Sequence, residues 1–401
     1  MPFALYMLSL AVFAQGTSEF MLSGLLPDIA RDLDISVSTA STLTSAFAVG
    51  MIVGAPLMAV LSMRWPRRRA LLTFLTVFLL VHVAGALTTH YPVLLATRVI
   101  AALANAGFLA VALATATGMA PAGAKGRATS VLLGGITLAC VAGVPGGALL
   151  GAAWGWRSAF WAVALVSVPA VVAIVRSVPA EAARPAATVG ARGELRALRA
   201  PRLRVLLLLG ALVNGATFCA LTYLGPLTTD VSGLGEGWVP VLLALFGVGS
   251  FLGVTVSGRL ADSRPLALLL TGGAALLAGW VAFALTAGHP TATVVFVLVQ
   301  AVLSFAVGST LIARALYAAT AAPTLGGGFA TAAFNVGAAL GPAIGALSIS
   351  AGLGYRSPLW VSALLVALAY VAAGAAYALG ALPRRSAPDP ATEEGADTTA
   401  A

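Results

Sequence analysis

The stretch GWRSAFW at residues 155–161 returns as GYRSPLW at residues 354–360, 199 residues later. The same offset pairs further proline, phenylalanine and glycine positions: Pro27 with Pro226, Phe47 with Phe246, Gly50 with Gly249, Gly54 with Gly253 and Pro66 with Pro265. Matches at one fixed offset indicate an internal repeat. The sequence therefore predicts two copies of one structural unit.

The composition predicts that this unit lies in a membrane. Of the 401 residues, 60% are hydrophobic and only 9% are charged, and the mean hydropathy is +1.00. A soluble domain carries about 25% charged residues. The long runs of Ala, Leu, Val and Gly fit helices, which satisfy their own backbone hydrogen bonds in lipid, rather than the alternating strands of a barrel.

Twelve segments approach the length of about 20 residues that a membrane-spanning helix needs. Those of the first copy are 3–26, 39–62, 70–88, 92–117, 128–151 and 157–178, and those of the second are 204–227, 238–260, 266–286, 291–319, 325–348 and 357–381. The first run exceeds the core of a signal peptide, about 7 to 15 residues, and we interpret it as a transmembrane helix. Six spans per copy give both copies one orientation, a parallel repeat.

We therefore expect an N-terminal six-helix bundle at 1–178, a cytoplasmic linker at 179–203, a C-terminal six-helix bundle at 204–381 and a disordered cytoplasmic tail at 382–401. The formal charge of +9 raises the alternative of a nucleic-acid partner, but most basic residues stand between apolar runs on one predicted side. The positive-inside rule accounts for them and places both termini in the cytoplasm. In the linker, Glu194 with Arg196, Arg199 and Arg202 suggests interfacial anchoring.

The motifs of catalysis and metal binding are absent from the sequence. It has no HExxH, no Cys/His cluster and no Gly-rich phosphate loop, so we expect neither an enzyme nor a metal site. We interpret Cys140 and Cys219 as core residues and His82, His90 and His289 as incidental. A membrane sensor or enzyme stays as a remote alternative.

Glu19 is the one carboxylate placed well inside a predicted span, and such a residue is a functional-site hypothesis by default. Gln15, Glu19 and Ser23 recur every four residues and form a polar stripe on one helix face. Arg98 in the fourth span lies at a similar depth, roughly 10 Å below the same boundary at 1.5 Å per residue. The pair indicates a proton-coupling site; the alternative is a static ion pair or a hydrogen-bonded acid that fastens helices.

Uncharged polar residues in other spans are candidates for a ligand site. They are Asn105, Asn214, Thr217, Thr222, Tyr223, Gln300, Ser304 and Asn335. Interspersed with Phe218, Phe246, Phe305 and Phe334, they suit a neutral, partly aromatic ligand. For each of them, a role in helix packing is the alternative.

Two cytoplasmic loops resemble a signature of the major facilitator superfamily. The loop GRLADSRP at 258–265 carries it through Gly258, Arg259 and Asp262, whereas its first-half counterpart AVLSMRWPRRR at 59–69 has Met63 in place of the acid. The resemblance implies a latch through Asp262 on the second half. Arg64, Arg67 and Arg68 take part in gating or, alternatively, anchor the topology and contact lipid phosphates.

The fifth span, GGITLACVAGVPGGALLG at 134–151, resembles the signature of drug antiporters within that superfamily. Gly143, Pro145, Gly146, Gly147 and Gly151 carry the match. Together with GTSEFMLSGLLPDIA at 16–30, and a partial fourth-span match around Arg98, it is similar to the chloramphenicol-resistance exporters.

This resemblance implies the major facilitator fold, a place in the inner membrane of a bacterium, and proton-coupled efflux of a small, neutral and partly aromatic antibiotic, with chloramphenicol favoured, by alternating access. Glu19 would bind the proton and Arg98 would tune it, with the proton gradient as energy source, no cofactor and a monomeric protein. The alternative is efflux of a sugar, nucleoside or other metabolite by the same scaffold.

Overall fold

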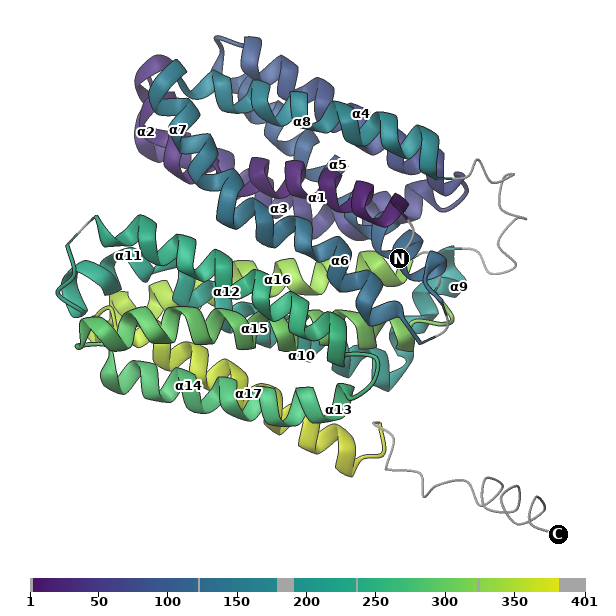
Figure 1. Ribbon diagram of the computed structural model, residues 1–401, viewed down its shortest axis with the longest axis vertical. Coiled ribbons are helices and arrows are strands. Elements are labelled where there is room, and N and C mark those ends of the chain that lie inside the picture. Colours follow the sequence, from purple (N-terminus) through teal and green to yellow (C-terminus); the bar gives the residue numbers. More distant parts are fainter. Residues whose placement is uncertain (1–2, 122, 179–190, 236, 323–324, 382–401) are drawn as a thin grey trace.

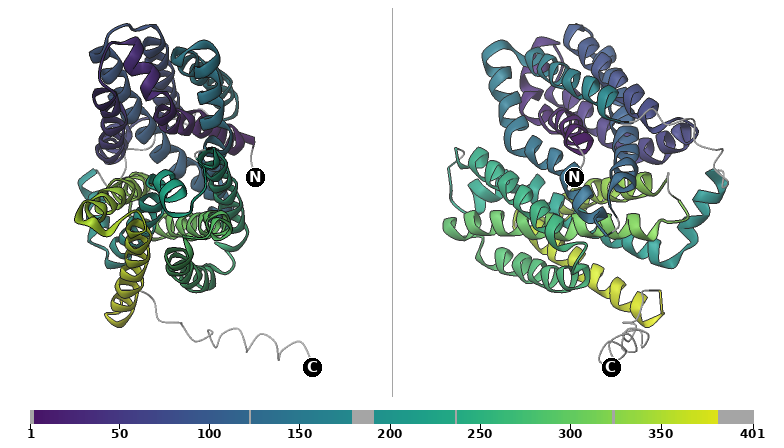
Figure 2. Two further views of the ribbon diagram at one scale, coloured as in Figure 1. Left: turned by 90° about the vertical axis from the view of Figure 1, so that its left-hand side faces the viewer. Right: turned by 45° about the vertical axis from the view of Figure 1, so that its right-hand side comes forward.

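The computed structural model describes residues 3–121, 123–178, 191–235, 237–322 and 325–381. These residues form helices joined by short turns, in two bundles that lie one above the other in Figure 1. Both views in Figure 2 show the same two bundles, one directly against the other. The upper bundle contains the first half of the chain and the lower bundle the second half.

The helices of the first bundle follow the predicted spans in order. They are α1 (Phe3–Phe20), α2 (Leu22–Asp32), α3 (Val37–Ser62), α4 (Arg67–Leu87), α5 (Tyr91–Met119), α6 (Lys125–Leu138), η1 (Ala139–Gly143), α7 (Val144–Trp154) and α8 (Trp156–Ser177). The linker contributes α9 (Ala191–Leu195) and η2 (Arg196–Arg199).

The second bundle repeats this order. Its elements are α10 (Pro201–Thr222), α11 (Leu224–Pro226), η3 (Leu227–Val231), α12 (Trp238–Leu260), α13 (Pro265–Ala267), η4 (Leu268–Gly272), α14 (Gly273–Thr286), α15 (Pro290–Ala318), α16 (Leu325–Ser348), η5 (Ile349–Leu353) and α17 (Ser357–Ala378).

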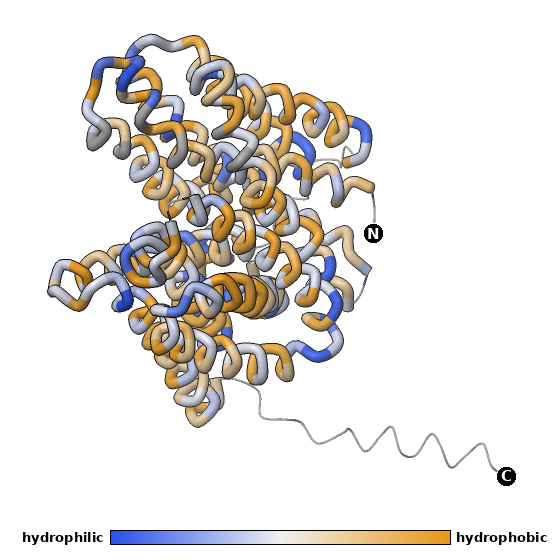
Figure 3. The backbone as a smooth tube through the Cα atoms, turned by 60° about the vertical axis from the view of Figure 1, so that its left-hand side comes forward, coloured by the Kyte–Doolittle hydropathy of each residue, from blue (hydrophilic) through white to orange (hydrophobic). Residues whose placement is uncertain are grey.

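Within the described residues, eleven helices are long and apolar enough to cross a membrane. The remaining first segment is divided at Met21 into α1 and α2, so it is not among the eleven. Hydrophilic residues gather at helix ends and hydrophobic residues along the helices (Figure 3). The prediction of an all-α membrane fold built from two bundles is confirmed.

Four spans change their winding to a π-helical turn, in which one backbone carbonyl is left without its usual α-helical partner. Two of these turns lie next to a proline, which lacks the N–H that an α-helix uses. The turn η1 ends just before Pro145, and η3 follows Pro226. Pro145 therefore leaves one carbonyl of the fifth span without its α-helical partner, in the region where η1 lies.

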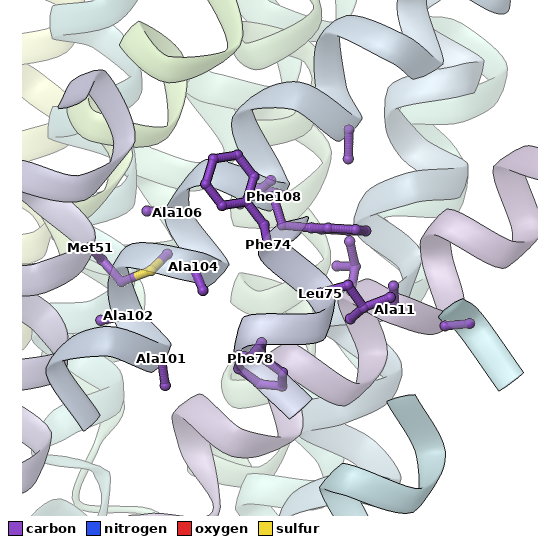
Figure 4. Packing of buried hydrophobic residues seen from close by; sticks show 14 of the residues in the cluster. Ala11, Met51, Phe74, Leu75, Phe78, Ala101, Ala102, Ala104, Ala106 and Phe108 are labelled. Atoms are coloured by element: carbon purple, nitrogen blue, oxygen red, sulfur yellow. The ribbon is translucent and has the colours of Figure 1, made fainter. Parts of the chain in front are cut away.

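Large aromatic side chains fill the centre of the first bundle. Phe74 and Phe78 of α4 and Phe108 of α5 are at most 6% exposed and lie together in Figure 4. Small buried residues of α5, including Ala101 and Ala102, allow the neighbouring helices to approach α5 closely. This alternation of large and small side chains permits the tight packing that association in lipid relies on.

Glycines bring the fifth span against the first. A Cβ at Gly135 would collide with the carbonyl oxygen of Ser9, and one at Gly143 would collide with the Thr17 side chain. Farther along, Gly147 faces Met21 and Gly151 faces Leu25. The contact therefore runs from Ser9 of α1 to Leu25 of α2.

The two bundles meet through helix pairs that the repeat exchanges. Helix α3 packs on α16 and α6 packs on α12, and the offset of 199 residues converts one pair into the other. We call the end of the molecule at which α9 lies the linker face, and the opposite end, with α2 and α11, the distal face (Figure 1). Near the linker face, Gly328 of α16 lies against Ala55 and Ala59 of α3.

Two carboxylates cap helix ends at the linker face. Asp262 accepts hydrogen bonds from the backbone N–H groups of Gly126 (2.8 Å) and Arg127 (3.0 Å), and the Tyr317 hydroxyl donates to it at 3.1 Å. Asp262 belongs to the second half and α6 to the first, so this cap joins the halves. A carboxylate at a helix N-terminus satisfies unpaired donors and complements the helix dipole.

The second cap comes from the linker. Glu194 of α9 is 1% exposed and accepts a hydrogen bond from the backbone N–H of Leu325, the first residue of α16, at 2.8 Å. The repeat offset of 199 residues pairs Gly126 of the first half with Leu325 of the second, and Met63 of the first half with Asp262 of the second. The linker therefore supplies the carboxylate that the first-half loop lacks. Glu194 is a buried cap, which differs from the interfacial anchor that the sequence suggested.

The distal face has an ion pair of its own. Arg157, in the repeated stretch at 155–161, bonds to Asp32 at the end of α2 and donates to the Thr88 carbonyl at 3.0 Å. The Trp156 indole N–H donates to the same carboxylate at 3.2 Å. The hydrogen bond from Arg157 holds the pKa of Asp32 below its usual value. These bonds tie the end of the first span to the start of the sixth.

The glycine contact predicts unequal effects for two adjacent substitutions. Gly135→Ala should destabilise the protein by about 1 to 3 kcal/mol, because the new methyl group overpacks against the Ser9 carbonyl. The matched control is Gly134→Ala, where a Cβ meets nothing within 4 Å. Thermal unfolding in detergent measures both variants; equal unfolding temperatures would contradict the packing argument.

The linker cap predicts a local effect at α16. Glu194→Ala should lower stability by about 1 kcal/mol and should speed amide exchange in the first turn of α16, because the Leu325 N–H loses its acceptor. Arg196→Ala, on the exposed side of the same linker segment, is the control. Exchange at the start of α16 that is equally slow in both variants would remove Glu194 as the cap.

Candidate functional site

A cavity of about 480 Å³ lies between the two bundles. The first bundle lines it from α1, α3, α5, α6 and η1, and the second from α10, α12, α15 and α16. Both halves thus contribute walls, as expected for a ligand site at the interface of a repeat. Its volume falls within the range of small-molecule sites, about 300 to 1,000 Å³.

Aromatic side chains make up much of the wall. Phe20 of α1 and Phe218 of α10 stack across the two halves, with ring centroids 6.4 Å apart. Phe246 and Phe305 meet edge to face at 5.8 Å, and Phe334 also lines the cavity. All four phenylalanines proposed from the sequence to surround the ligand, namely Phe218, Phe246, Phe305 and Phe334, lie on its wall.

Uncharged polar groups are interspersed with these rings. Asn214 donates through its amide nitrogen to the Phe334 carbonyl at 2.7 Å, and Asn335 donates to the Thr331 carbonyl at 2.9 Å. Each amide oxygen is then available as an acceptor. The hydroxyls of Ser304 and Thr331 are buried and have no hydrogen-bond partner among the described residues. Such groups are suited to receive a polar ligand atom.

Glu19 is the only acidic residue on the cavity wall that the structure describes. It stands one residue before the end of α1, next to Phe20. Asn105 of α5 lies within hydrogen-bonding reach of its carboxylate, and Arg98 acts on it through space. A single carboxylate in an apolar cavity is a group whose charge state responds to its surroundings.

Arg98 is buried, at 1% exposure, and is held by the first span. Its Nη1 donates to the Ser18 hydroxyl and its Nη2 to the Ser18 carbonyl, both at 2.9 Å. The guanidinium also lies 4.6 Å from the Phe47 ring centroid and 5.8 Å from that of Phe160. The ion pairs found among the described residues do not include Arg98 with Glu19. Arg98 therefore bonds to the residue that precedes Glu19.

Among the substrate residues proposed from the sequence, Asn214, Thr217, Phe218, Thr222, Ser304 and Asn335 line the cavity. Gln15, Asn105, Tyr223 and Gln300 are not among its lining residues. The Tyr223 hydroxyl donates to the Pro342 carbonyl at 2.8 Å, and the Gln300 amide donates to the Leu276 carbonyl at 3.1 Å. Gln15 is 1% exposed and its amide has no partner among the described residues. The side chain of Ser23 lies outside the described part of the structure.

The proposed packing and gating residues divide by location. Gly143, Gly147 and Gly151 face the first span, whereas a Cβ at Gly146 would meet nothing within 4 Å, and the side chain of Pro145 is outside the described part. At the linker face, Gly258 lies against Ser130 of α6, next to the Asp262 cap. Arg64 and Arg259 are exposed there, and Arg67 and Arg68 are partly buried.

Several wall residues were not proposed from the sequence. Phe20, Thr331 and Cys140 are examples. Thr331 precedes Asn335 by one helical turn and Phe20 adjoins Glu19, so helical spacing could have indicated both. Nothing in the sequence pattern distinguishes Cys140 from a core residue.

Comparison with known proteins identifies the family that this chain matches. Residues 8–327 match the family model described as Major Facilitator Superfamily. A protein of Streptomyces lividans named chloramphenicol resistance protein is 57% identical over 375 residues, which cover 93% of this chain and 96% of the relative. The inner membrane transport protein YdhP of Escherichia coli K12 is 33% identical over 92% of this chain and 94% of its own length.

Solved structures show the same fold at low sequence identity. The transporter FucP, crystallised in an outward conformation, has a TM-score of 0.74 at 15% identity and matches 93% of this chain and 98% of its own. The human organic anion transporter MFSD10 has a TM-score of 0.72 at 19% identity, with 92% of this chain and 97% of its own covered.

The unpartnered hydroxyl of Ser304 yields a prediction for the ligand-free protein. Ser304→Ala should cause no loss of stability, because it removes a buried polar atom that gains no hydrogen bond in the fold. Ser250→Ala is the matched control, because the Ser250 hydroxyl is buried and donates to the Gly247 carbonyl at 2.7 Å. Thermal unfolding in detergent should show a loss only for Ser250→Ala; the reverse order would exclude Ser304 as an unpaired group.

Proposed function

Because this chain belongs to the major facilitator superfamily, we propose that it exports a small, neutral, partly aromatic antibiotic in exchange for protons, with chloramphenicol as the favoured substrate. The observation that carries the proposal is the single carboxylate of Glu19 on the wall of an otherwise uncharged aromatic cavity. The superfamily consists of transporters, and the chain is a transporter rather than an enzyme.

The chemistry of the cavity supports this substrate class. Chloramphenicol has a nitrophenyl ring, two hydroxyls and an amide, and it carries no charge. The stacked pair of Phe20 and Phe218 and the edge-to-face pair of Phe246 and Phe305 offer places for a ring. The amide oxygens of Asn214 and Asn335 and the hydroxyl of Ser304 offer partners for its polar groups. The relative named for chloramphenicol resistance points to the same compound.

The proton step follows from electrostatics. An apolar, water-poor cavity favours neutral Glu19, whereas water or the positive field of Arg98 favours the carboxylate. As the cavity is exposed first to one side of the membrane and then to the other, these contributions change. Glu19 thus takes up a proton on one side and releases it on the other. Arg98 stays with the first span and sets the field at Glu19.

We propose that the linker face is cytoplasmic and that the membrane is the inner membrane of a bacterium. Basic residues of the loops at 59–69 and 258–265 and of the described part of the linker lie at this face, whereas Arg31 and Arg157 pair with acids of α2 at the distal face. The bundles at 1–178 and 204–381 act as two rigid halves of a monomer, with 179–203 as linker and 382–401 as tail. Contacts of α3 with α16 and of the Asp262 cap with α6 keep the linker face closed.

A sugar or another highly hydroxylated metabolite is the second candidate. It would need a dense array of charged or bidentate polar side chains, because each desolvated hydroxyl requires a partner. The phenylalanine pairs on the wall favour the aromatic substrate instead.

The test uses purified protein reconstituted in vesicles, with the linker face outward, and follows entry of labelled chloramphenicol under an imposed proton gradient. Glu19→Gln should abolish gradient-driven entry but keep drug binding, since an amide fills the same space and cannot exchange a proton. The matched control is Asp28→Asn, the same chemical change at an exposed ion pair with Arg31 at the distal face.

Each result assigns a different part of the proposal. Loss of driven entry in Glu19→Gln alone, with equilibrium binding preserved, supports proton exchange through Glu19. Normal driven entry by Glu19→Gln removes Glu19 as the proton carrier. If wild-type vesicles move other compounds and leave chloramphenicol behind, the substrate is wrong and the transporter stands.

A further inference from the structure

Three buried polar side chains from three helices form a continuous chain of hydrogen bonds through Ser18, the residue that precedes Glu19. They are His82 of α4, Ser18 of α1 and Arg98 of α5, with exposures of 1%, 0% and 1%. The Ser18 hydroxyl lies 2.6 Å from His82 Nε2 and 2.9 Å from Arg98 Nη1. His82 Nδ1 lies 2.7 Å from the Phe78 carbonyl oxygen. His82, interpreted from the sequence as incidental, is therefore part of the network that contains Arg98.

The partners fix the direction of every bond in this chain. A carbonyl oxygen only accepts, so His82 Nδ1 carries a proton and donates to Phe78. In the neutral ring Nε2 is then an acceptor, and the Ser18 hydroxyl donates to it. Since the single hydroxyl proton points to His82, the lone pairs of Ser18 face Arg98 and accept from Nη1.

The surroundings of His82 keep this arrangement in one form. Its ring lies between Phe78, at 4.2 Å between centroids, and Phe160 of α8, at 5.7 Å. The charged group that acts on it is Arg98, and a second positive charge on the imidazole would oppose it. A protonated ring would also direct N–H at the Ser18 oxygen, turning the hydroxyl proton toward Arg98.

We propose that His82, acting through Ser18, is a positioning residue that holds the Arg98 guanidinium at a fixed distance from Glu19. This inference rests on the proposed function of Glu19 as proton carrier. Ser18 directly precedes Glu19 in α1, so a guanidinium held by the hydroxyl and carbonyl of Ser18 keeps its place relative to the carboxylate. His82 orients the hydroxyl; without it the hydroxyl rotates and the bond to Nη1 loses its preferred direction.

The proposal predicts a shift in the pH dependence of transport. In His82→Phe, which keeps an aromatic ring in the site, and in Ser18→Ala, Arg98 is freed to move toward the Glu19 carboxylate and stabilise its charge. Both variants should move the midpoint of the pH dependence of driven chloramphenicol entry to lower pH, by about 0.5 to 1 unit. The double variant should shift it no further, because both changes break one chain.

The control for the loss of a buried hydroxyl is Ser167→Ala. Ser167 of α8 is 0% exposed and donates within its own helix to the Val163 carbonyl at 2.8 Å, so its loss should leave the midpoint unchanged. If His82→Phe does not fold, Ser18→Ala decides by the same measurement.

The outcomes separate this inference from the function on which it rests. The proposal is overturned if the variants lower the rate of driven entry but leave its pH midpoint unchanged, or if the two midpoint shifts add in the double variant. His82 and Ser18 would then be packing residues. Normal driven entry by Glu19→Gln would instead overturn the proposed function itself. A common, non-additive shift together with a coupling defect in Glu19→Gln supports both.

Discussion

The hydrogen bonds between Arg98 and Ser18 are the constraint on which the arrangement of the first bundle depends. A guanidinium in a membrane interior is tolerated only where protein surrounds and pairs it. Here two of the guanidinium nitrogens, Nη1 and Nη2, donate to one residue of α1, and the cation lies 4.6 Å from the ring centroid of Phe47 and 5.8 Å from that of Phe160. Helices α1, α3, α5 and α8 thereby meet around one charge, and Glu19 is left at the cavity wall.

The repeat explains why the cavity lies where it does. Because α3 corresponds to α12 and α6 to α16, the two most extensive contacts between the halves, α3 with α16 and α6 with α12, are one contact used twice. The walls between these contacts come from pairs of corresponding helices, but their side chains differ: the first half supplies the acid and the second supplies the amides. A symmetric scaffold thus encloses an asymmetric site, with the ionisable group on one side and most uncharged partners on the other.

Hydropathy and the spacing of prolines were enough to predict the twelve spans and the repeat, because membrane thickness and helix rise leave little freedom. They did not predict the division of the first span at Met21, which lies between Glu19 and Gly24. The candidate site was predictable in part. Glu19 and six of the substrate candidates reach the cavity wall, whereas Gln15 does not.

The different fates of Gln15 and Glu19 have a geometric reason. Residues four apart in an α-helix are separated by about 40° around its axis, so a stripe of such residues turns steadily across the surface. Between Gln15 and Glu19 it passes from the packed side of α1 to the cavity. The sequence also could not predict which residue of α1 bonds to Arg98. Ser18 and Glu19 are adjacent, and only the conformation of the Arg98 side chain decides between them.

The buried carboxylate of Glu194 has a consequence for how the protein is made. Its partner, the Leu325 N–H, lies 131 residues farther along the chain. During synthesis Glu194 therefore cannot make this hydrogen bond until Leu325, the first residue of α16, has been added. A chain that stops before Leu325 lacks the N–H group that donates to the Glu194 carboxylate. The bond between Glu194 and α16 can therefore form only after most of the second bundle has been synthesised.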